Sequence, residues 1–289
     1  MINFLKYKKI YYLISTIVIL VGFWGLLTGG MRPSIDFTGG TELEYKADKS
    51  LNEAKIREVF AENFTNKDRL NLSILPENQI HILYEPIDEK KEAEVRKSVE
   101  NKLSLKLTTL RFEVVGPTLG SELLFKTVIA SLLATISILL YITYAFKRLN
   151  YGLAAVMAMV HDLLVLWGVF GLVIKFTTAQ VDTLFVTAVL TTLSFSVHDT
   201  IVVFDKIREL KRKSMGSIEN HANKALTETM VRSLNNSLTI ALMLLCLVLL
   251  GGETTRYFAV ALLIGTITGT YSSPFIATPI LVWLENRKK

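Results

Sequence analysis

Two His-Asp pairs lie inside long apolar segments, and they are the residues best placed to do chemistry. His198-Asp199 belongs to an apolar run that begins near Leu184, and His161-Asp162 lies about midway along another run. An ionised carboxylate at membrane depth costs at least about 2.5–3.5 kcal/mol on insertion scales. Membrane proteins that keep such an acid generally use it to bind an ion or to carry a proton. We therefore predict that Asp199 couples the protein to an ion gradient.

The residues around Asp199 indicate how a proton could be loaded and released. By helical spacing, Thr191, Ser194 and His198 lie near the same face as Asp199, so hydroxyl groups could lead water to the acid. An apolar bundle favours the protonated form of a carboxylate, whereas a nearby cation favours its ionised form. Arg232 leads into the next apolar segment and is the cation that we expect to modulate Asp199.

Each acid also has a structural interpretation. Asp199 could lie at the membrane interface, because Asp205 follows soon after it. Asp162 could hold helices together through buried hydrogen bonds, which are worth about 0.6 kcal/mol each on average in membrane proteins. Because neighbouring residues on a helix do not face each other, His161 and Asp162 are expected to point to different faces. Asp182, at the start of its apolar segment, is expected to cap that helix.

Composition and hydropathy predict a membrane protein that also has a part folded in water. The chain has 289 residues, of which 51% are hydrophobic, and its mean hydropathy is +0.39. The single cysteine, Cys246, lies in an apolar run, so no disulfide can form within the chain. Six segments have about the 20 residues that a helix needs to cross a bilayer. They are residues 10–29, 123–146, 151–174, 183–204, 233–250 and 257–284.

The spans divide the chain into three parts. Residues 1–30 hold the N-terminus and the first transmembrane helix, 31–122 a charged domain, and 123–289 a five-helix bundle with a basic loop, 205–232. Lysine and arginine gather at the two ends of the chain and in the loops on the same side, which predicts that both termini are cytoplasmic. The 31–122 domain is then extracytoplasmic. This orientation accounts for the net charge of +6 without a nucleic acid partner.

The 31–122 domain alternates between strand and helix patterns. Strands are expected over 35–45, 69–75, 79–84 and 108–115, with helices over 51–60, opened by a Ser50 cap, and 87–105. The order βαββαβ is typical of a ferredoxin-like α+β sandwich. No phosphate loop, nucleophile elbow or paired-cysteine site occurs in the chain, so we expect no enzyme activity and no metal or cofactor. His81 alternates within a strand and is expected to have no metal.

Three motifs, taken in their order, resemble the SecF family of protein translocase subunits, which belongs to the resistance-nodulation-division superfamily. They are Ile35-Asp36-Phe37-Thr38-Gly39-Gly40-Thr41, Val115-Gly116-Pro117-Thr118-Leu119-Gly120, and the run from Asp199-Thr200-Ile201-Val202-Val203-Phe204-Asp205 to Glu209. Any one of these alone is a weak signal, but the three in this order are highly specific, and the resemblance covers essentially the whole chain. The resemblance implies six transmembrane helices with one outer domain after the first.

The resemblance also implies a place of action and a set of partners. The protein is expected in the bacterial inner membrane, with its outer domain in the periplasm, paired with SecD and often with YajC, and associated with the SecYEG channel. With SecD it would use the proton-motive force to promote late translocation and release of secreted preproteins.

The resemblance assigns roles to matching residues. Asp199 would carry the proton, with Arg232 modulating it and His198 and Asp162 completing the coupling set. A hinge is implied at residues of the first two motifs, namely Asp36, Gly39, Gly40, Gly116 and Pro117. The family usually has Asn-Asp where this chain has His198-Asp199, and a histidine titrates near neutral pH.

The energetics of a proton suit such a role. One proton crossing 100 mV releases about 2.3 kcal/mol, and each pH unit adds about 1.4 kcal/mol. These amounts can bias a movement between two states.

The alternative functions are half of a proton-coupled small-molecule or lipid exporter, and a sensor or scaffold whose outer domain binds a ligand. The coupling ion is expected to be a proton, with sodium as the alternative.

Overall fold

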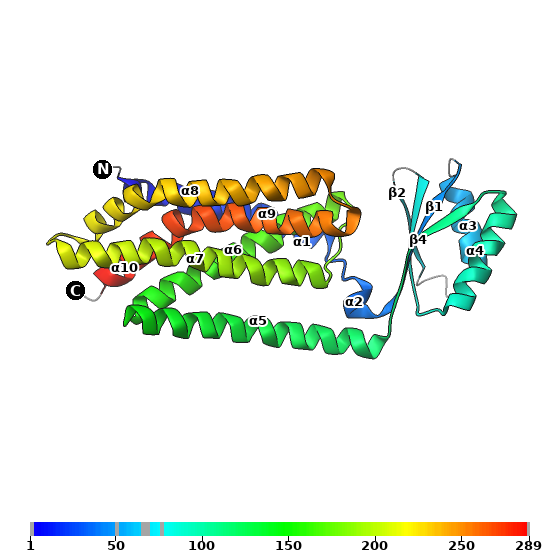
Figure 1. Cartoon of the computed structure of the whole chain (residues 1–289), viewed down its shortest axis with the longest axis horizontal. Helices are drawn as coiled ribbons and strands as arrows, with labels where there is room; N and C mark the ends of the chain where they lie inside the picture. Colours follow the sequence, from blue (N-terminus) through cyan, green and yellow to red (C-terminus); the bar gives the residue numbers. More distant parts are fainter. Residues whose placement is uncertain (1–2, 50–51, 65–69, 76–77, 288–289) are drawn as a thin grey trace. The chain divides into compact units, whose positions relative to one another are not determined.

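The computed structural model describes residues 3–49, 52–64, 70–75 and 78–287. It contains two compact units, one made of Met1–Arg32 and Ile129–Lys289, the other of Pro33–Val128. Within the described residues, six helices are long and apolar enough to cross a membrane, and a small sheet domain lies between the first two of them in sequence (Figure 1). The predicted fold class is thereby confirmed.

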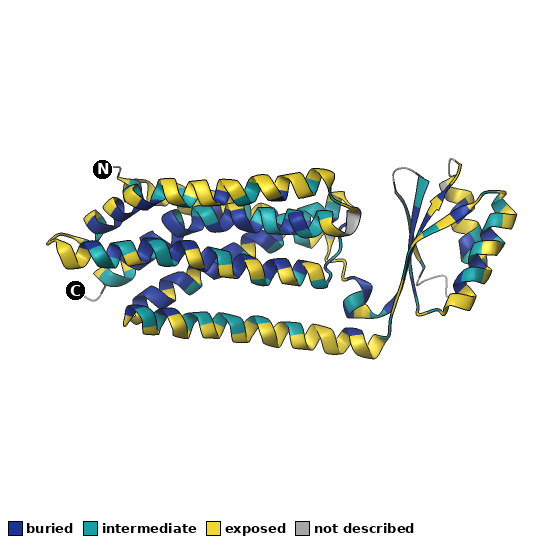
Figure 2. Ribbon diagram, viewed as in Figure 1, coloured by how far each residue is buried: buried dark blue, intermediate teal, exposed yellow. Residues whose placement is uncertain are grey.

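Three of the long helices form the interior of the helical unit. In each of the spans that contain α6, α7 and α9–α10, half or more of the 18-residue stretch with the highest hydropathy is buried. The buried shares are 56%, 50% and 56% respectively. The same figure is 17% for α1, 0% for α5 and 11% for α8, whose outer faces are largely exposed (Figure 2). The elements are η1 (Phe4–Tyr7), α1 (Lys8–Gly29), α5 (Pro117–Phe146), α6 (Leu149–Phe176), α7 (Thr183–Lys213), α8 (Ile218–Leu250), α9 (Glu253–Ser272), the π-helical η4 (Ser273–Ala277) and α10 (Thr278–Asn286).

Glycines bring two pairs of these helices into close contact. The Gly265-xxx-Gly269 spacing predicts a close approach, and it is confirmed: a Cβ on Gly265 would lie 2.1 Å from Thr192 Oγ1 of α7. A second contact escaped the sequence analysis. A Cβ on Gly22 of α1 would lie 2.5 Å from the Cα of Gly168 on α6, so the two backbones touch.

Most of the segment expected as a basic loop, 205–232, is helical. Helix α7 continues to Lys213, and α8 begins at Ile218. At the other end of α7, Asp182 caps the helix as predicted, because its side chain accepts a hydrogen bond from the Phe185 amide. Hydropathy marks only the part of a helix that can lie in lipid. The helix continues in water because pairs such as Lys206–Glu209 stabilise its polar turns.

The second unit is the predicted βαββαβ sandwich. Its sheet has the order β2-β3-β1-β4 with antiparallel neighbours, and α3 and α4 cover one face (Figure 1). Alternate residues of β1 and β3 face these helices, including Leu43, Tyr45 and Ile82, which are fully buried. The elements are α2 (Ile35–Thr38), β1 (Gly40–Ala47), α3 (Glu53–Asn63), β2 (Asn71–Leu75), β3 (Gln79–Tyr84), α4 (Glu89–Leu103) and β4 (Leu107–Val115).

Two local predictions in this unit differ from the structure. Residues 35–38, expected as strand, form a helical turn because the Ser34 side chain accepts a hydrogen bond from the Asp36 amide. Gly39, with φ +70°, ends that turn before β1. Helix α3 is capped by Asn52, which accepts a hydrogen bond from the Lys55 amide. Ser50, the predicted cap, lies outside the described residues.

Replacing Tyr45 with phenylalanine should destabilise the sheet unit. The buried Tyr45 hydroxyl donates a hydrogen bond of 2.9 Å to Glu92 Oε1, and burial, together with this carboxylate, raises the pKa of Tyr45. Hydrogen bonds to charged groups contribute about 1.5–3 kcal/mol, so we expect a loss of that size in Tyr45→Phe. Amide hydrogen exchange of β1 and α4 in the full chain measures it. Tyr144→Phe, which removes an exposed hydroxyl, is the control; equal protection in both variants contradicts the prediction.

Candidate ion-coupling site

Asp199 lies at a pocket between α7 and α8. Its side chain is almost buried, at 5% exposure, and one carboxylate oxygen accepts a hydrogen bond from Ser233 Oγ of α8. The pocket has a volume of about 220 Å³. It is lined by His198, Asp199, Val202, Arg232, Ser233 and Asn236. Three of the four residues predicted for ion coupling therefore meet at one place, contributed by two helices.

The immediate partner of Asp199 is a hydroxyl rather than the expected cation. Arg232 is exposed and lines the pocket, but no hydrogen bond or ion pair joins it to Asp199 within the described part of the chain. The sequence analysis missed Ser233, the next residue. Because Arg232 is expected to face Asp199, the adjacent Ser233 is also a candidate for direct contact with Asp199.

The buried polar face of α7 is not the predicted one. Thr191 and Ser194 are exposed, and Thr191 Oγ1 donates to the backbone carbonyl of Thr187 within its own helix. The buried polar residues are instead Thr192, Ser196, Asp199 and Thr200. The spacing 192, 196, 200 follows the face that packs against the glycines of α9. Thr191 and Ser194 are thus not among the buried polar residues of α7, and the hydroxyl path along them stays a prediction.

Asp162 lies in a separate, fully buried cluster at 0% exposure. Its Oδ2 accepts hydrogen bonds from Ser196 Oγ of α7 at 2.5 Å and from Ser272 Oγ of α9 at 2.7 Å. His161 Nδ1 lies 2.9 Å from Asp162 Oδ1, and its Nε2 lies 3.2 Å from the hydroxyl of Tyr271. The expectation that His161 and Asp162 point to different faces is wrong, because the side chains turn toward each other.

The two clusters connect α7 to three other helices. Asp162 joins α6 to α7 and α9, and Asp199 joins α7 to α8. Between them, Thr200 Oγ1 lies 2.9 Å from Ser273 Oγ at the π-helical η4. A carboxylate that gains or loses a proton changes which of these bonds it can accept, so the arrangement can convert protonation into a shift of α7.

The first two sequence motifs meet in the sheet unit. A Cβ on Gly39 would lie 2.6 Å from Pro117 Cα, and one on Gly120 would lie 2.9 Å from the Gly39 amide. Gly40, at φ +136°, approaches the carbonyl of Tyr84. Asp36 lies in the first turn of α2, where a carboxylate complements the helix dipole. The start of α5 is thus packed directly on the end of α2.

Gly39→Ala should disrupt this junction. The new methyl group would clash with the Pro117 backbone, and a non-glycine residue at φ +70°, ψ 163° costs about 1–3 kcal/mol. We expect faster proteolysis or amide exchange at α2 and at the start of α5. Gly116→Ala is the matched control, because no described atom lies within 4 Å of the added Cβ. If both variants behave alike, close packing at Gly39 is not what the motif requires.

His81, for which the sequence predicts no metal, lies in a cluster of charged side chains. Its Nε2 lies 2.7 Å from Glu42 Oε1, and the other oxygen of Glu42 lies 3.3 Å from Arg111. Ligand atoms of Glu42, Glu44 and His81 lie within 4.8 Å of one another, a spacing that could admit a metal ion. Because Arg111 already neutralises Glu42, the cluster is better explained as an ion-pair network. Strand pairing, which opposes Glu44 to His81, creates it.

Comparisons with known proteins identify a family. Residues 94–287 match the family described as protein export membrane protein SecD/SecF, C-terminal, and residues 24–50 match the SecD/SecF GG motif. The protein translocase subunit SecF of Thermobaculum terrenum is 37% identical, with 99% of this chain and 95% of that protein covered. SecF of Anaerolinea thermophila is 36% identical over the same shares.

Solved structures show the same fold. The chain is similar to SecDF from Thermus, described as a translocon-associated membrane protein, with a TM-score of 0.86 and 28% identity. A super-membrane-facing form of SecDF gives a TM-score of 0.69 at 27% identity. In both comparisons 99% of this chain is covered but only 39% of the other, because the SecDF chains are much longer.

Proposed function

Because the chain belongs to the SecF family of protein translocase subunits, we propose that it uses the proton-motive force, together with SecD, to promote the late translocation and release of secreted preproteins. Further proposed partners are the SecYEG channel, YajC and the moving preprotein. The chain is a multi-pass membrane protein of the protein-export machinery and not an enzyme.

The observation that carries this proposal is Asp199 in its pocket. An almost buried carboxylate lies between two helices, with a serine hydroxyl bonded to it and an arginine at the pocket wall. When ionised, Asp199 accepts the Ser233 bond and attracts Arg232. When protonated, it loses the attraction to Arg232, and α7 is free to shift against α8. Each cycle of loading and release would move these helices once.

A proton suits this pocket better than sodium. A sodium ion would find oxygen ligands on Asp199, Ser233 and Asn236, but only one of them, Asp199, carries a negative charge among the described residues of the pocket lining. Arg232 at the same wall repels a metal cation but does not prevent protonation of Asp199. His198, exposed at the pocket, could pass protons to or from water. Asp162 is proposed mainly as the residue that holds α7 against α6 and α9.

The movement must reach the outer domain. We propose that both termini lie in the cytoplasm and the 31–122 domain in the periplasm, because the lysines and arginines gather at the end of the bundle that carries both termini. The family motif residues Asp36, Gly39, Gly40, Gly116 and Pro117 would transmit the movement. The close contact of Gly39 with Pro117 supports a packed junction that moves as one piece rather than a bending hinge.

Gradient-dependent export in membrane vesicles tests the proposal. Vesicles that contain SecYEG, SecD and this chain receive a preprotein, and its release is measured with and without a proton gradient. We expect the gradient to accelerate release only when the chain is present. Arg232→Gln should reduce the gradient-dependent part about tenfold, the effect of roughly 1.4 kcal/mol, and Arg232→Lys should reduce it less. Gradient-driven efflux of small molecules without any effect on preprotein release would instead support the exporter alternative.

A further inference from the structure

A second pocket lies at the end of the helical unit where α5 passes into α6 and where α7 ends. Its volume is about 330 Å³. Five of its seven lining residues are cationic, and the other two are aromatic. They are Phe146, Lys147, Arg148, Tyr151, Arg208, Lys211 and Arg212.

The cations of this pocket exceed the acids that pair with them. Arg148 and Lys211 share Glu285, at 2.9 and 3.0 Å, and Arg208 pairs with Asp205. Among the described residues, no ion pair forms at Lys147 or Arg212. Five cations against two carboxylates leave three positive charges without compensation, concentrated around one cavity.

The backbone contributes helix ends of both signs, because α6 begins at this pocket while α5 ends at Phe146 and α7 ends at Lys213. Helix α6 begins at Leu149, and its N-cap residue, Arg148, makes no side-chain capping hydrogen bond. The first amides of a helix carry a partial positive charge and bind anions well. Arg208 is held in place, since its Nη1 donates to the Ala145 carbonyl at 3.0 Å and its guanidinium lies 4.9 Å from the Phe146 ring centroid. The pocket is therefore organised before any anion arrives.

We propose that this pocket binds a phosphate group, and specifically the headgroup phosphate of an anionic phospholipid. Basic residues that only orient a membrane protein need not converge on a cavity, whereas basic pockets at helix ends bind lipid headgroups. The adjacent last turns of α5 are open for acyl chains, because Tyr141 and Tyr144 are exposed, Tyr144 to 84%. Leu149, the first residue of α6, is exposed as well.

Lipid titration followed by native mass spectrometry tests the site. The full chain in neutral detergent is titrated with phosphatidylglycerol and, separately, with phosphatidylcholine. The test variant is the double substitution Lys147→Gln with Arg212→Gln, which removes two cations without breaking an ion pair recorded in the described chain. We expect phosphatidylglycerol to bind the wild type and the double variant to bind it about thirtyfold more weakly, which corresponds to about 1 kcal/mol for each of the two cations removed.

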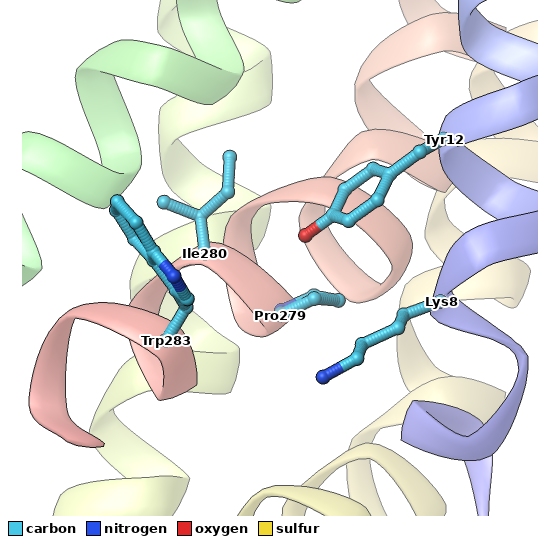
Figure 3. Close-up of a pocket in the computed structure, with 5 residues that line it drawn as sticks. All are labelled: Lys8, Tyr12, Pro279, Ile280 and Trp283. Atoms are coloured by element: carbon cyan, nitrogen blue, oxygen red, sulfur yellow. The ribbon is translucent and has the colours of Figure 1, made fainter. Parts of the chain in front are cut away.

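A matched control removes two cations at the same end of the bundle but outside the pocket. Lys8 borders a different cavity, with Tyr12, Pro279 and Trp283 around it (Figure 3). The double variant Lys8→Gln with Lys9→Gln should bind phosphatidylglycerol as the wild type does. If it loses as much binding as the pocket variant, general surface charge is responsible and the proposal is overturned.

Two further outcomes decide the ligand. If inorganic phosphate or glycerol phosphate competes with phosphatidylglycerol at equal concentration, the site is one for soluble phosphate and the lipid assignment is wrong. If phosphatidylcholine binds as tightly as phosphatidylglycerol, the pocket does not select an anion. Selective binding of phosphatidylglycerol that only the pocket variant weakens supports the proposal.

Discussion

Asp199→Asn is expected to abolish the part of preprotein release that depends on the proton gradient, while the protein still assembles with SecD. Asparagine has nearly the same shape as aspartate, and its carbonyl oxygen can still accept the hydrogen bond from Ser233. It cannot release a proton in this pH range, so Arg232 would never meet an ionised partner. The measurement is the rate of release with and without an imposed gradient, with co-purification of SecD as the test of assembly.

Two companion variants separate coupling from packing. Ser233→Ala removes the direct partner of Asp199 but leaves the acid, so we expect weakened coupling rather than none. Asp162→Asn should chiefly lower stability, because Asp162 accepts bonds from both α7 and α9. If Asp199→Asn releases preprotein at the wild-type, gradient-dependent rate, the proposed proton role is wrong. If only Asp162→Asn loses coupling, the ion site belongs to the buried cluster instead.

Gly168→Val is expected to prevent stable packing of α1 on α6. A Cβ at this position would already lie 2.8 Å from the Cα of Gly22, and a backbone atom cannot move aside as a side chain can. Overpacking costs about 1–3 kcal/mol in ordinary cores, and we expect about 3 kcal/mol or more for valine here. Helices in lipid lack a hydrophobic force between them and depend on such close contacts. Only 17% of the 18-residue stretch of highest hydropathy in the first span is buried. Helix α1 therefore has little other packing to replace the lost contact.

Thermal unfolding of the detergent-solubilised protein measures this effect, and a graded series makes it specific. Gly168→Ala should destabilise less than Gly168→Val. Gly252→Ala adds the same methyl group at the N-cap of α9, where no described atom lies within 4 Å of it, so it should cost at most a capping effect of about 1 kcal/mol and lower the unfolding temperature less than Gly168→Val does. If Gly168→Val unfolds at the temperature of the Gly252→Ala control, the backbone contact between α1 and α6 does not support the fold.

Sequence alone determined the features that arise within single segments. Hydropathy located six spans and the domain after the first, because an apolar run of about 20 residues has few stable environments besides lipid. Alternation predicted the βαββαβ order, and Asp182 was recognised as a helix cap from its position alone. Asp199 also stands out as a candidate coupling residue, because a carboxylate in an apolar segment needs an explanation whatever its neighbours are.

Only the tertiary structure decided which polar groups meet. Ser233 bonds to Asp199 from another helix, and Ser196 and Ser272 reach Asp162 from two. Helical spacing alone favoured the 191–194 face of α7, yet the contact of Gly265 with Thr192 turns a different face inward. One helix has several possible polar faces, and its own sequence does not say which of them a partner covers. That choice depends on how closely two backbones can approach, which is a property of pairs of helices.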